Sequence, residues 1–138
     1  MRHNVLNLAT AVFAIIATAG PGLAQSFKAS NRTIVNPVPG GFEAIEGEMG
    51  GRGMWCAAAD YARSVLGAKG TDRVYIATAR GNSISQPGRK GVVFTLDSTG
   101  LTPRNVLIVG SSVREPGSNL SVDHAHIFCD DYKLRSSR

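Results

Sequence analysis

The feature that most constrains the fold is one amphipathic stretch in the middle of the chain, residues 55–67. Residues on one face of the helix that it would form recur at spacings of three and four: Trp55, Ala58, Ala59, Ala62 and Leu66. The alanines let the helix backbone lie close to whatever it covers, and Gly67 suits a left-handed C-terminal cap. The segments that follow have strand character. The sequence therefore predicts a helix packed across a sheet.

Several stretches are rich in β-branched and aromatic residues and bounded by glycine, proline or asparagine. The principal ones are residues 42–46, 73–80, 92–96, 106–109 and 120–128. Because no second helix is expected between the later strands, they should pair antiparallel. The predicted class is α+β, with one main helix on a curled antiparallel sheet of about five strands. We expect loose order over residues 25–53 and a frayed, basic tail at 133–138.

The N-terminus has the pattern of a secretory signal peptide. Arg2 supplies a positive charge, residues 5–19 are mostly apolar, and residues 22–24 offer small side chains for cleavage. The apolar stretch is too short to favour a membrane span. We therefore interpret residues 1–24 as a cleaved signal and residues 25–138 as a single domain, periplasmic or secreted, with no membrane span after cleavage.

The chain contains two cysteines, Cys56 in the predicted helix and Cys129 near the C-terminus. In an exported protein, two cysteines most often form one disulfide bond. A bond that closes a loop of this length is worth about 4 kcal/mol in the loop-entropy model. The sequence thus predicts a Cys56–Cys129 disulfide that ties the helix to the last strand.

A thiol nucleophile is the alternative use of Cys56. A cysteine in the first helical turn has a lowered pKa, and His124 or His126 on a later strand would supply a base. The layout resembles that of papain-like and cell-wall thiol peptidases. However, Cys56 is followed by three alanines in place of the serine or glycine of those families. This Cys-His thiol hydrolase interpretation competes with the disulfide for the same sulfur.

A metal site is a second alternative. His124 and His126 would lie on the same face of a strand, where two imidazoles can chelate Cu or Zn. No spacing identifies a third ligand, so the primary expectation is neither a metal nor another cofactor.

Basic residues provide the leading functional hypothesis. Arg52 lies in a glycine-rich approach to the helix, and Arg80, Arg89 and Lys90 flank a long polar loop within residues 80–91. The formal net charge of +5 falls to about +4 without Arg2. The loop has no aromatic residue for base stacking, which argues against nucleic acid. We expect an exported, non-enzymatic domain that binds an anionic envelope polymer or an acidic protein.

Parts of the chain resemble small exported bacterial proteins of unassigned activity. The resemblance rests on residues 42–43 with 54–62, on residues 73–76 and on residues 93–95. It implies a bacterial, exported setting and carries over no catalytic residue.

Overall fold

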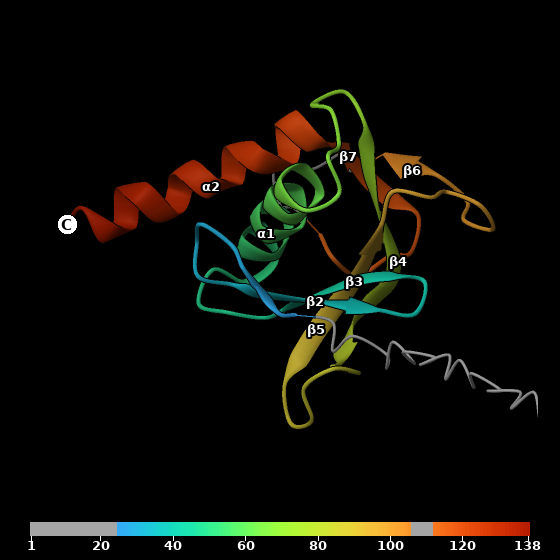
Figure 1. The fold of residues 1–138 in the computed structure, drawn as a ribbon, viewed down its shortest axis with the longest axis horizontal. Helices are drawn as coiled ribbons and strands as arrows, with labels where there is room; N and C mark the ends of the chain where they lie inside the picture. The colour runs from blue at the N-terminus through green and yellow to red at the C-terminus, as the bar shows by residue number, and fades with distance from the viewer. Residues whose placement is uncertain (1–24, 106–111) are drawn as a thin grey trace, which may run out of the picture.

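The computed structural model describes residues 25–105 and 112–138, which form one sheet and two helices (Figure 1). The elements in chain order are β1 (Phe27–Lys28), β2 (Ile34–Val38), β3 (Gly41–Ile45), α1 (Gly50–Ser64), β4 (Arg73–Asn82), β5 (Lys90–Thr95), β6 (Arg104–Asn105), β7 (Ser118–Ser121) and α2 (Val122–Ser136). The strands lie in the order β1-β2-β3-β5-β4-β7-β6. All pairs are antiparallel except β6 with β7. The α+β class is confirmed, with six antiparallel strands and the short parallel β6 in place of about five. The predicted signal peptide and the predicted strand at 106–109 lie outside the described residues.

The described elements stack in three layers. Helix α1 contacts β2, β3 and β4 on one side and α2 on the other, so it lies between the sheet and the second helix (Figure 1). Ion pairs from Arg63 to Asp123 and from Arg52 to Asp131 show that the two helices run antiparallel. Neither helix of the described chain is long and apolar enough to cross a bilayer.

The small side chains of α1 follow from its place in the middle layer. Ala57, Ala58 and Ala59 are all fully buried, although three consecutive residues point in different directions around a helix. A helix covered on two sides has to be apolar around most of its circumference. Alanine satisfies that need while letting both neighbours approach closely.

Large aromatic side chains fill the space between α1 and the sheet. Phe42 of β3 and Phe94 of β5 lie opposite each other in neighbouring strands. Trp55 meets Phe94 edge to face at 5.0 Å between ring centroids, and Tyr61 lies 4.7 Å from Phe42. These rings form the core that fixes α1 against the sheet.

The bounds of α1 differ from those expected. The helix begins at Gly50, because the glycine-rich segment forms its first turn, and ends at Ser64. Leu66 lies beyond the helix and is 47% exposed, whereas Gly67 has the left-handed φ of +67° that a C-terminal cap requires. Residues 25–53, expected to be loosely ordered, contain β1, β2, β3 and the start of α1.

The predicted strand at 120–128 is wrong beyond Ser121, because a second helix begins there. The Ser121 hydroxyl caps α2 by accepting the backbone N–H of His124 at 3.2 Å. The buried positions Val122, Ala125 and Cys129 follow helical spacing. Since α2 continues to Ser136, most of the tail expected to fray is helical.

The close packing around α1 gives a testable prediction. Ala58→Leu adds three carbons at a fully buried position and should lower the free energy of unfolding by about 1–3 kcal/mol. Ser64→Leu makes a similar addition at an exposed position of the same helix and should change stability by less than about 0.5 kcal/mol. Urea unfolding of both variants measures the difference. Equal effects would contradict the three-layer arrangement.

Candidate functional site

The disulfide decides the role of Cys56. Cys56 and Cys129 are bonded, with their Cα atoms 4.9 Å apart, and both side chains are buried. They are the two cysteines of the chain, so no thiol remains. The predicted disulfide is confirmed, although it joins α1 to a helix and not to a strand. A hydrolase that uses Cys56 as its nucleophile is incompatible with this bond, and that alternative is wrong.

The two histidines do not form the expected chelating pair. His124 and His126 lie on α2, where residues two apart point in directions about 160° apart, to nearly opposite sides of the helix. The described residues contain no group of three or more His, Cys, Asp or Glu side chains placed to hold a metal ion. The expectation of a shared face was wrong because it depended on a strand.

Arg52 connects the two helices. Its Nε lies 2.8 Å from Asp131 Oδ2, and its guanidinium lies 4.8 Å from the centre of the Phe128 ring. The side chain therefore braces α1 against α2 at the end of the pair where α1 begins.

The basic residues of the predicted recognition loop divide into two kinds. Arg80 donates two hydrogen bonds to Glu46, at 2.7 and 2.6 Å, which lower the pKa of that carboxyl. Arg89 donates to the Glu46 backbone oxygen at 3.0 Å, and Lys90 donates to Asn82 at 2.7 Å. All three residues are exposed, but among the described residues only Arg80 of the three forms an ion pair. Arg80 mainly holds β4 to the end of β3, while Arg89 and Lys90 present charge to solvent.

Sequence reasoning missed Glu43, which organises this loop. Glu43 lies in the strand expected at residues 42–46, whose pattern gave no sign of a buried charge, yet the residue is only 1% exposed. Its carboxylate accepts hydrogen bonds from the backbone N–H and hydroxyl of Ser85, from the Ile84 N–H and from the Ser83 hydroxyl. Since β5 lies between β3 and β4, residues 83–85 must pass over β5 to reach it. The segment 83–89, called here the β4–β5 loop, is thus fastened to the face of the sheet opposite α1.

Further polar contacts extend the attachment of this loop. Asn36 of β2 donates to the Ser85 hydroxyl oxygen at 2.8 Å and accepts from the Ser26 hydroxyl at 2.6 Å. Gly91 leaves room for the carboxylate, because a Cβ there would lie 2.7 Å from Glu43 Oε1. The spacing of Ser83, Ser85 and Gly91 is the only local signal in the sequence, and by itself it does not identify Glu43 as the partner.

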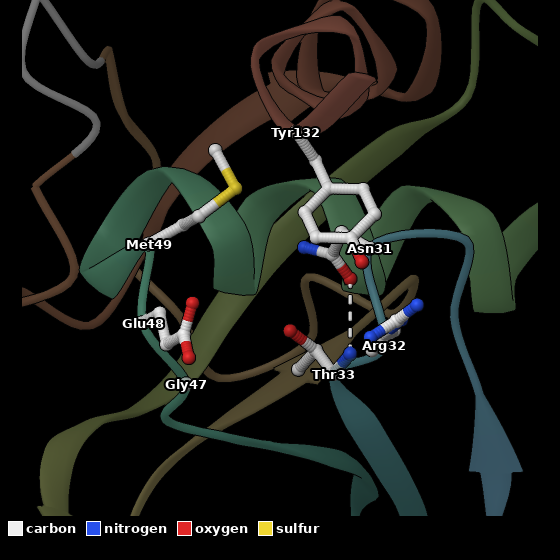
Figure 2. Close-up of a pocket in the computed structure, with 7 residues that line it drawn as sticks. All are labelled: Asn31, Arg32, Thr33, Gly47, Glu48, Met49 and Tyr132. Atoms are coloured by element: carbon white, nitrogen blue, oxygen red, sulfur yellow. Dashed lines mark hydrogen bonds between the residues drawn. The ribbon is translucent and has the colours of Figure 1, made fainter. Parts of the chain in front are cut away.

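A second feature lies where α1 begins and α2 extends past it. Tyr132 of α2 lies above the Asn31–Thr33 turn, and Met49 flanks the space between them (Figure 2). The hollow has a volume of about 240 Å³. Two further hollows, of about 300 and 400 Å³, share Met49 with it. Together they form a groove along the C-terminal half of α2.

The environment of Glu43 gives a pH prediction. Burial raises the pKa of this carboxyl, but the four hydrogen bonds together outweigh that effect and hold the pKa below its ordinary value of 4.5. A lowered pKa means that the carboxylate contributes stability above pH 4.5 and loses that contribution as the pH falls further. Glu43→Gln should therefore cost about 2 kcal/mol or more at neutral pH, and the difference from wild type should shrink toward about pH 3.

The control for this prediction is Glu115→Gln, which changes an exposed carboxylate and should have little effect at either pH. Urea unfolding at each pH provides the measurement. A loss of stability in Glu43→Gln that stays constant across the range would show that the charge of Glu43 is not what fastens the loop.

Comparison of the chain with protein-family models, with curated proteins and with solved structures found no match. The resemblance to small exported bacterial proteins therefore stays a prediction. The function has to be inferred from the residues of this chain alone.

Proposed function

We propose that this protein is an exported, non-enzymatic binding domain that holds an anionic polymer of the cell envelope through its β4–β5 loop. The observation that carries the proposal is the buried Glu43 carboxylate, which accepts four hydrogen bonds from residues 83–85. Burying a charge is costly unless it is fully hydrogen-bonded. Here the hydrogen bonds fix the conformation of an exposed loop. A role of this loop in binding a partner would explain why a charge is buried to hold it.

A loop fixed before binding loses little conformational entropy when it meets its partner. The attachment through Ser85 and Asn36 places the loop across the sheet, and it protrudes at the lower end of the view in Figure 1. Arg89 ends the loop, Lys90 follows it as the first residue of β5, and both are exposed. A protruding cationic loop suits an extended anionic chain better than it suits a small molecule that needs a cavity.

Export to an oxidising compartment is part of the same proposal. A disulfide bond is compatible with a periplasmic or secreted protein. The expected signal at residues 1–24 would deliver the domain to the envelope, where anionic polymers occur.

Charge reversal provides the test of the loop. Arg89→Glu with Lys90→Glu should weaken binding to dextran sulfate, used as a linear polyanion, by about tenfold. Added salt should weaken wild-type binding as well, because exposed charges are screened. Fluorescence titration at low and moderate ionic strength measures both effects.

The matched control is Lys28→Glu with Lys69→Glu, which changes the net charge equally at exposed positions outside the loop. The proposal predicts a much smaller effect for this pair. If both double variants lose affinity equally, binding depends on net charge alone and the loop is not the site.

A further inference from the structure

We infer that the groove between α1, α2 and the β1–β2 turn is a second binding site, and that it takes an extended acidic segment of a polypeptide. The groove shares no residue with the β4–β5 loop. The inference goes beyond the proposed function and does not depend on it.

The shape of the groove favours an extended ligand. Its three hollows, of about 240, 300 and 400 Å³, share Met49 and follow the C-terminal half of α2. Pockets for compact ligands usually enclose about 300–1,000 Å³ in a single cavity. A row of separate, open hollows along one helix matches the successive side chains of a peptide better than it matches one compact molecule.

The positive charge of the groove favours an acidic partner. Four arginines line it, contributed by the β1–β2 turn, α1 and the end of α2: Arg32, Arg52, Arg135 and Arg138. The acidic lining residues are Glu48 and Asp131, and Asp131 is already paired with Arg52. Within the described part of the chain, the other three arginines form no ion pair. Guanidinium groups bind carboxylates through paired hydrogen bonds, so acidic side chains are the complementary chemistry.

Apolar side chains lie between these charges. Met49 and Leu134 line the hollows, and Leu134 is 68% exposed. The Tyr132 ring lies over the first hollow beside Asn31 (Figure 2). Cations that alternate with apolar surface match a polypeptide that carries both acidic and apolar side chains.

The groove is held by rigid parts of the fold. The disulfide at Cys129 fixes α2 to α1 one turn before Tyr132. On the opposite wall, Asn31 accepts the Thr33 N–H at 3.1 Å and donates to the Gly53 backbone oxygen at 2.8 Å. Arg32 lies between them with a φ of +66°, a conformation that is uncommon for residues other than glycine. Both walls are therefore set before a ligand arrives.

The test uses a labelled peptide of glutamates interspersed with leucines, titrated by fluorescence anisotropy against the full chain. Arg32→Asn with Arg135→Gln should raise the dissociation constant by about tenfold. Asparagine tolerates the left-handed conformation at position 32, and Arg135 is exposed on α2, so both changes leave the fold intact. A thermal melt of each variant confirms folding.

A second variant tests the shape without changing charge. Gly47 lines the first hollow, and a Cβ there would meet only the Thr33 hydroxyl, at 3.7 Å. Gly47→Leu should therefore fill the hollow while leaving the fold intact, and should weaken peptide binding by a similar factor. Lys90→Glu, which reverses a charge beside the β4–β5 loop at a residue that bonds to Asn82, should leave binding of this peptide within about twofold.

The charge control is Lys28→Gln with Lys69→Gln, which removes two positive charges outside the groove. The inference is overturned if this pair weakens peptide binding as much as the groove pair, if Gly47→Leu has no effect, or if the wild-type protein does not bind the peptide. Binding of dextran sulfate that responds to the groove variants in the same way would assign the groove to general polyanions and also contradict the inference.

Discussion

The bond between Cys56 and Cys129 is the constraint on which the rest of the structure depends. It joins α1 to α2 through two buried sulfurs separated by 73 positions in the sequence. Closing a loop of that length is worth about 4 kcal/mol, a large share of the 5–15 kcal/mol that stabilises a typical domain. The bond keeps α2 on the outer side of α1, so α1 is covered on both sides and its run of alanines becomes necessary. It also places Tyr132 and Arg135 beside the N-terminal end of α1, where the groove lies.

The far face of the sheet depends on a second constraint, the burial of Glu43. A carboxylate at 1% exposure persists there because the β4–β5 loop supplies all four of its hydrogen bonds. In Figure 1 the loop protrudes at the lower end, whereas α2, which lines the groove, extends to the left. The fold therefore offers two separately organised surfaces, a protruding loop with Arg89 and Lys90 and a concave groove with Arg32 and Arg135. Both carry positive charge, which is consistent with the basic composition of the chain.

The sequence predicted those features that depend on local spacing or on counting. The Trp55–Ala62 spacing identified the central helix, the two cysteines identified the disulfide, and the β-rich segments identified β3, β4 and β5. Features that depend on distant partners were missed. The burial of Glu43 was missed because the loop that covers it lies 40 residues away. The second helix was missed because residues 120–128 were assigned as a strand on their composition, and the Ser121 cap and the helical spacing of Val122, Ala125 and Cys129 were overlooked. The groove was not predictable, since it combines three segments that only the disulfide and the packing of α2 bring together.

The most direct test of this account compares the free energy of unfolding of the oxidised and the fully reduced protein in urea at neutral pH. If the Cys56–Cys129 bond holds the layers together, the reduced protein should be less stable by about 4 kcal/mol, with a correspondingly lower urea midpoint. Equal stability in the two forms would show that α2 packs on α1 without the bond, and would contradict the account.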